Sequence, residues 1–218
     1  MRGDQSASLD SWVAIDFEAA SSRGTPCSVG LIEVMSGRVV NRHSWLIRPP
    51  VFEFSDFNVA LHGITPEMCE HAPSWEDSLV KILDIAAGRP LVAHNASFDV
   101  GVIRDACDLA CVVRPGLRYM CTLVAARRIW PGLSAYSLPF LAAHLGLVAK
   151  SHHDAAEDAA LAAQIALAAL DATQTFTLDA LAERAGMFMG SVDAGSGADV
   201  APAPISPRSR PSRHTGQP

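Results

Sequence analysis

Three short segments of this chain carry acidic residues at spacings suited to binding metal ions. The first is Asp16-Phe17-Glu18, which closes a short apolar run. Side chains of a strand alternate between its faces, so Asp16 and Glu18 are expected on one face and Phe17 on the other. Two carboxylates held this close repel each other unless a cation lies between them, and Mg²⁺ prefers oxygen ligands. A solvated strand end would explain the pair equally well if it stood alone.

The second segment is His94-Asn95-Ala96-Ser97-Phe98-Asp99, which follows a brief apolar run at 91–93. Ser97 is expected to cap a helix that runs to about residue 110. Asp99 then lies in the first turn, where the helix dipole favours a negative charge. Helix-end stabilisation accounts for Asp99 alone. The whole hexapeptide is more specific, since its four fixed positions match by chance in roughly one chain per thousand.

The third segment is His153-Asp154-Ala155-Ala156-Glu157-Asp158. Asp154 and Glu157 fit the N-cap and third positions of a helix, which gives both a structural role. Asp158 lies one turn into that helix, on the side that His153 can also face. A histidine beside a metal-binding carboxylate titrates in the range that a general base requires. His152 is the weaker candidate for this role, and a lone surface histidine is the alternative interpretation.

The surrounding apolar pattern predicts an α/β domain with a mixed sheet. A first strand is expected at 12–17, and strands at 28–34 and 39–47 should form a hairpin. Residues 51–70 show no clear period and are expected to be irregular. Further strands are expected at 91–93 and 119–121, and helices at 74–87, 97–110, 122–128, 137–145, 154–171 and 177–185.

The length of 218 residues suits one domain with an appendage. We expect a flexible N-terminus at 1–10, the main domain at 11–171 and a helical appendage at 172–189. The segment 190–218 is rich in Gly, Ala, Pro and Ser, so we expect a disordered tail. The net charge of −6 argues against passive binding along nucleic acid, although metal ions can supply local positive charge.

The five cysteines are odd in number and form no CxxC pair. They therefore indicate neither a disulfide framework nor a zinc ribbon, and they suit a reducing cytoplasm. The first ten residues lack the apolar core of a secretory signal. No apolar run approaches the roughly 18 residues of a membrane span, so we expect a cytoplasmic protein with no membrane partner.

The three segments together resemble the motifs of the DnaQ-like (DEDDh) 3′→5′ exonucleases. This family includes the proofreading epsilon subunit of bacterial DNA polymerase III and RNase T. Its pattern is DxE in a first strand, then an HNxxFD-like segment, then His-x₄-Asp. The matching residues occur in the same order: Asp16, Glu18, Asp99, His153 and Asp158. The resemblance spans about 11–171 and implies an RNase H-like fold, a mixed five-stranded sheet flanked by helices.

The resemblance also implies a catalytic mechanism with two metal ions, Mg²⁺ or Mn²⁺. Asp16 would bridge both ions, and Glu18 and Asp158 would complete one of the two sites. Asp99 would bind the other ion, mostly through water. His153 would take the proton from the attacking water.

Substrate contacts are implied near the terminal nucleotide. The residues concerned are Phe17, Ala19, His62, Ile64 and Asn95. Many family members have Thr where this chain has Ala19, so a hydroxyl contact is missing there while a backbone contact would remain. Phe17 could instead pack in the core, Ile64 could anchor its loop, and Asn95 could order its turn.

The resemblance implies 3′→5′ hydrolysis of nucleic acid, with DNA of a proofreading or repair type as the first choice. An RNA-trimming exoribonuclease is the alternative, and a non-catalytic nucleic-acid-binding subunit is another. No long basic strip suggests duplex binding, so we expect a single-stranded partner with a free 3′ end. The tail could tether the enzyme to a polymerase or repair partner.

Overall fold

The computed structural model describes residues 10–148, 153–195 and 199–200, and β1 (Ser11–Ala19) is an interior strand of its sheet. Most of this strand is buried, as expected for a strand covered on both faces. It pairs antiparallel with β2 (Pro26–Met35) and parallel with β4 (Leu91–Ala93). β3 (Arg38–Leu46) forms the predicted hairpin with β2, so the hairpin and the predicted first strand are confirmed.

The sheet of the described residues runs in the order β3-β2-β1-β4-β5-β6-β7. β5 (Leu117–Cys121) is parallel to β4, whereas β6 (Gly190–Val192) and β7 (Asp199–Val200) are added antiparallel. The mixed sheet is confirmed and includes the five predicted strands. Two short strands extend it beyond the number that the sequence predicted.

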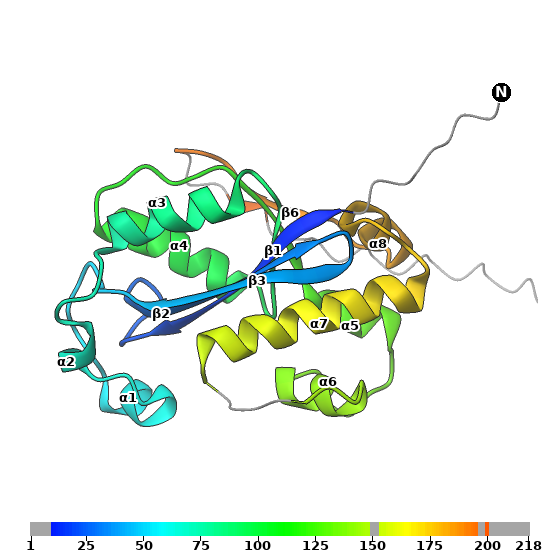
Figure 1. The fold of residues 1–218 in the computed structure, drawn as a ribbon, viewed down its shortest axis with the longest axis horizontal. Helices are drawn as coiled ribbons and strands as arrows, with labels where there is room; N and C mark the ends of the chain where they lie inside the picture. The colour runs from blue at the N-terminus through cyan, green and yellow to red at the C-terminus, as the bar shows by residue number, and fades with distance from the viewer. Residues whose placement is uncertain (1–9, 149–152, 196–198, 201–218) are drawn as a thin grey trace, which may run out of the picture.

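Helices cover both faces of the sheet (Figure 1). One face carries α3 (Trp75–Ala86) and α4 (Ser97–Leu109). The other carries α5 (Thr122–Ile129), α7 (Ala155–Thr173) and α8 (Leu178–Arg184), with α6 (Leu138–His144) packed against α5 and α7. None of the helices in the described ranges is long and apolar enough to cross a membrane.

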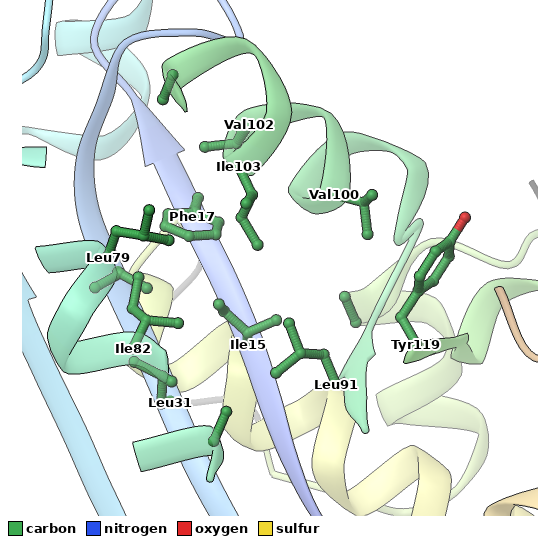
Figure 2. Packing of buried hydrophobic residues seen from close by; sticks show 14 of the residues in the cluster. Ile15, Phe17, Leu31, Leu79, Ile82, Leu91, Val100, Val102, Ile103 and Tyr119 are labelled. Atoms are coloured by element: carbon green, nitrogen blue, oxygen red, sulfur yellow. The ribbon is translucent and has the colours of Figure 1, made fainter. Parts of the chain in front are cut away.

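The alternation of side chains along β1 divides the interior into two cores. Ile15 and Phe17 face α3 and α4, where they pack with residues such as Ile82 and Ile103 (Figure 2). Trp12 and Ala14 face the opposite side and pack against α7 and α8. Asp16 and Glu18 share the parity of this second set, so the strand period directs both carboxylates toward the α7 side.

Residues 51–70 differ from the irregular segment that was expected. They contain two short helices, α1 (Asp56–His62) and α2 (Pro66–Cys69). The side chain of Ser55 caps α1 by accepting a hydrogen bond from the backbone N–H of Asn58. α1 buries none of its residues, so it lacks the apolar stripe by which a helix is recognised in a sequence.

The expected helix cap at Ser97 was wrong. The N-cap of α4 is Ala96, and no side chain caps it. Ser97 is the first helical residue, and its hydroxyl donates to the Asn95 Oδ1 atom at 3.3 Å. Asn95 has a positive φ of 59°, so the turn before the helix is made by the asparagine, a residue type that tolerates this conformation.

The ordered chain continues past residue 189, where the disordered tail was expected to begin. β6 pairs with β5, and its Val192 is buried in the core beside α3 and α4. Gly190 lies so close to the Tyr119 ring that a Cβ atom would overlap it. A three-residue strand with one large apolar side chain gives too little pattern to detect from the sequence.

Candidate active site

A cavity of about 410 Å³ opens beside the second half of β1. Its lining includes all five residues that the motifs singled out: Asp16, Glu18, Asp99, His153 and Asp158. They come from β1, from the first turns of α4 and α7, and from the residue before the α7 cap. The structure therefore brings together groups that lie up to 142 positions apart in the sequence.

The start of α7 can approach the strand because residue 30 is a glycine. Gly30 of β2 is the register partner of Asp16, and a Cβ atom there would overlap the backbone of Ala155. α7 therefore lies directly against the sheet beside the two β1 carboxylates. The nearest ligand atoms of Glu18, His153 and Asp158 all lie within 4.8 Å of one another, close enough to share one ion.

Asp99 is held in place from the opposite side of the strand. It belongs to the first turn of α4 and is 1% exposed. Its Oδ1 atom accepts a hydrogen bond from the backbone N–H of Phe17 at 3.2 Å. Phe17 itself is buried in the core and its ring lies 6.2 Å from that of Trp75, so the strand that Asp99 contacts is firmly packed.

Burial and mutual repulsion raise the pKa values of the clustered acids. Burial has the largest effect on the pKa of Asp16, and the charges of Asp99, Asp158 and Glu18 raise it further. Burial, followed by repulsion from Asp158 and Asp154, raises the pKa of Glu18 to about 7. Burial also raises the pKa of Asp99, against the lowering effect of the bond from Phe17. Without a cation these groups must share protons.

The donor set fits divalent metal ions. Four carboxylates around one cavity offer the hard oxygen ligands that Mg²⁺ and Mn²⁺ prefer, and bound cations would offset the repulsion that raises the acid pKa values. Glu18, His153 and Asp158 already have the spacing of a shared ion site. The fit therefore rests on both the ligand type and the ligand geometry.

His153 lies at the exposed rim of this cluster. It has a positive φ of 60° and directly precedes the α7 cap. That cap is Asp154, whose Oδ1 atom accepts from the backbone N–H groups of Ala156 at 2.9 Å and Glu157 at 3.3 Å, as predicted. The cap therefore fixes the backbone on which His153 lies. His152, the competing candidate, falls outside the described residues.

Four of the five residues expected to contact substrate line the same cavity: Phe17, Ala19, His62 and Asn95. The Nδ1 atom of His62 accepts from the backbone N–H of Ile64 at 3.0 Å, so its Nε2–H donates to the Ala19 carbonyl oxygen at 3.2 Å. Ile64 is 8% exposed and packs with buried Ala20, Cys27 and Cys69. It lies outside the main cavity, in a neighbouring hollow that also contains His62 and His153.

Several cavity residues had no assigned role in the sequence. His94 is held between the Thr122 hydroxyl at 2.9 Å and the Tyr136 carbonyl at 3.0 Å. Burial lowers its pKa to about 4, so it is neutral at pH 7 and fixes the turn before Asp99. Arg23 also lines the cavity. It belongs to no motif, and only the structure places it in the cavity that the carboxylates line.

The comparisons with known proteins agree with this geometry. The family model RNase_T, described as exonuclease, matches residues 13–166. The PolC-type DNA polymerase III of Caldanaerobacter subterraneus is 30% identical over 186 residues, covering 83% of this chain but 13% of the polymerase. The DNA polymerase III subunit epsilon of Aquifex aeolicus is 28% identical over 163 residues, covering 73% of this chain and 80% of that protein.

Among solved structures, Exonuclease X in complex with 5′ overhanging duplex DNA superposes with a TM-score of 0.65. It is 27% identical, and the match covers 80% of this chain and 99% of that one. The chain thus matches nearly the whole of a solved nuclease, whereas it spans about an eighth of the PolC-type polymerases.

Proposed function

This chain belongs to the RNase_T exonuclease family, and we propose that it hydrolyses nucleic acid from the 3′ end to nucleoside 5′-monophosphates with two divalent metal ions. The observation that carries this proposal is the convergence of the four motif carboxylates and His153 on a single cavity. Such a cluster is electrostatically unfavourable without cations, and two-metal hydrolysis is the chemistry that uses it.

Asp16, Glu18, Asp99 and Asp158 would hold the ions. Asp16 would contact both, Glu18 and Asp158 would complete one site, and Asp99 would contribute to the other. The chemistry that bound ions supply at such a site is acidification of a water and stabilisation of negative charge on the leaving 3′ oxygen. His153, at the rim beside Glu18 and Asp158, would accept a proton from the attacking water.

The substrate we propose is DNA with a free single-stranded 3′ end. Support comes from the likeness to Exonuclease X, whose structure holds DNA, and from the relatives that are DNA polymerase components. Those relatives also support a polymerase or repair partner. The five cysteines are all free, which supports a place in the reducing cytoplasm.

The test is digestion of 5′-labelled single-stranded DNA and RNA of equal sequence, with Mg²⁺ or Mn²⁺ and with EDTA. We expect a ladder that shortens by single nucleotides from the 3′ end, DNA cut faster than RNA, and no cutting in EDTA. Faster cutting of RNA would favour the exoribonuclease alternative. Binding without cutting would favour the non-catalytic subunit, and internal cuts alone would reject exonuclease action.

A further inference from the structure

Arg23 is the one lysine or arginine among the residues that line the active-site cavity, all of which lie in the described part of the chain. It belongs to the loop between β1 and β2, and its side chain is 42% exposed. Four carboxylates line the same cavity, and the whole chain carries a net charge of −6. A single cation in such surroundings points to an anionic group of the substrate.

The Arg23 side chain lies against α4, where it packs over Gly101 and binds Asp105. Its Nε atom donates to the Asp105 Oδ2 atom at 2.8 Å. A Cβ atom at Gly101 would lie 2.6 Å from both the Cδ and the Nε atom of Arg23. Glycine inside a helix is less favourable than alanine. The helix therefore carries a glycine at the position where the arginine packs, one turn before its ion-pair partner.

The loop that carries Arg23 is also held in place. The Thr25 hydroxyl donates to the Ser22 carbonyl at 2.7 Å, and its oxygen accepts from the backbone N–H groups of Ser21 and Ser22 at 3.0 Å. Gly24 allows close approach to α4, because a Cβ atom there would lie 2.7 Å from the Leu109 Cδ1 atom. Little conformational entropy is then lost when Arg23 binds a ligand.

The acidic residues next to Arg23 are also paired with other arginines. Asp105 also accepts from the Arg104 Nε atom at 2.8 Å, and Asp108 pairs with Arg114 at 2.6 Å. Within the described part of the chain, no protein group hydrogen-bonds the two terminal nitrogens of Arg23. The guanidinium therefore keeps donors in the geometry that matches phosphate oxygens.

Arg23 stands at the boundary between two hollows. One is the active-site cavity, and the other, of about 550 Å³, is lined by Ser22, Arg23, Gly24, Asp105, Asp108 and Leu109. Glu18, His153 and Asp158, whose ligand atoms are close enough to share one ion, also line the active-site cavity. A nucleic-acid strand whose 3′-terminal phosphodiester lay at the carboxylates could leave the cavity past Arg23.

We propose that Arg23 is a positioning residue that binds a backbone phosphate upstream of the scissile one. This inference rests on the proposed exonuclease function and extends it to the way the enzyme recognises a polynucleotide chain. A substrate with only the scissile phosphate gains nothing from Arg23. A longer strand gains one charge-assisted phosphate contact that does not take part in the reaction.

The test compares an oligodeoxynucleotide with the p-nitrophenyl ester of thymidine 5′-monophosphate, whose only phosphate is the one hydrolysed. Arg23→Gln should raise KM for the oligonucleotide about tenfold, as expected for a lost hydrogen bond to a charged group at a partly exposed site. The kcat for the oligonucleotide and both constants for the ester should stay near those of the parent. Oligonucleotide affinity in Ca²⁺ should depend less on salt, with a log–log slope shallower by about 0.7.

Gly101→Ala provides a second variant that does not change charge. Its Cβ atom should displace the Arg23 side chain while favouring the helix, so the protein should stay folded and the oligonucleotide KM should rise as in Arg23→Gln. The double variant should be no worse than Arg23→Gln alone. Arg118→Gln, which removes the same charge outside the cavity, is the matched control.

An unchanged oligonucleotide KM in Arg23→Gln, with an active parent, would overturn the inference. Equal losses on the ester and the oligonucleotide would also overturn it, because Arg23 would then act at the scissile phosphate. A parent that hydrolyses neither substrate would instead reject the proposed function on which the inference rests.

Discussion

The Asp99 carboxylate accepts a hydrogen bond from the backbone N–H of Phe17 at 3.2 Å, which ties the first turn of α4 to the strand between Asp16 and Glu18. The contact is buried and joins residues 82 positions apart. Asp99 thus has a structural role in addition to the metal-binding role that we propose. The two roles can be separated, because the hydrogen bond needs an acceptor oxygen whereas the metal site needs a negative charge.

We therefore expect Asp99→Asn and Asp99→Ala to abolish activity alike but to differ in stability. The asparagine amide oxygen can still accept from Phe17, and loss of the charge relieves the repulsion that raises the acid pKa values, so metal-free stability should be kept or increased. Alanine leaves a buried N–H without its partner, which costs about 1–3 kcal/mol. Urea unfolding and turnover would check this, and equal destabilisation by both changes would contradict it.

Asp16→Asn tests the ligand that we place between the two ions. Turnover should fall by more than about 10³-fold, since a bridging ligand serves both metal sites. The metal-free protein should melt at the same or a higher temperature, because burial and four neighbouring acids raise the pKa of Asp16 and so penalise its charged form. Asp77→Asn, an exposed change in α3, is a control. Near-normal turnover in Asp16→Asn would place the active site elsewhere.

Metal removal should make stability strongly dependent on pH. The folded-state pKa of Glu18 is about 7 against an ordinary value of 4.5, so the folded protein holds this proton more tightly than the unfolded chain. The resulting stability is fully present below about pH 4.5 and is lost as pH rises through about 7. In EDTA the melting temperature should therefore fall across this window. Mg²⁺ or Mn²⁺ should raise it more at pH 8 than at pH 5, and equal shifts at both would contradict carboxylate ligation.

The short strand β6 should contribute to stability although the sequence around it has no readable apolar period. Truncation after Met189 removes buried Val192 and the β5–β6 pairing, and burial of one such side chain is worth about 1.5–3 kcal/mol. A chain that ends at Val200 keeps both β6 and β7 and is the matched comparison. Thermal unfolding of the two should differ clearly. Equal melting temperatures would show that β6 adds nothing.

The sequence predicted that the motif acids lie in one cavity. It could do so because short-range rules fix the strand face or the helix turn on which each acid lies. Strand alternation puts Asp16 and Glu18 on one face, and the Asp154 cap defines where α7 begins and hence where Asp158 lies. The motif resemblance supplied the association between these segments. That the three segments lie together is shown by the structure independently of this resemblance, since all three line the cavity.

The features that could not be predicted from the sequence depend on packing between distant segments. Gly30 and Gly101 resemble ordinary strand and helix glycines until α7 and Arg23 are seen to lie against them. The cap of α4 was misassigned because a serine was preferred, whereas the turn is made by Asn95 at positive φ. α1 buries no side chain, and β6 is three residues long, so neither has a readable period.

His153 can be a general base or a metal ligand, and its place within 4.8 Å of Glu18 and Asp158 ligand atoms is compatible with both. As a base, it should lose about 10²–10⁴-fold in turnover on His153→Ala, with little change in Mn²⁺ affinity because four carboxylates remain. Added imidazole should restore part of the turnover, since a free base can occupy the space left at the exposed rim. His152→Ala, the same change at the adjacent position, should be mild. Weakened Mn²⁺ binding without imidazole rescue would make His153 a ligand instead, and a larger loss at His152 would assign the role to that neighbour.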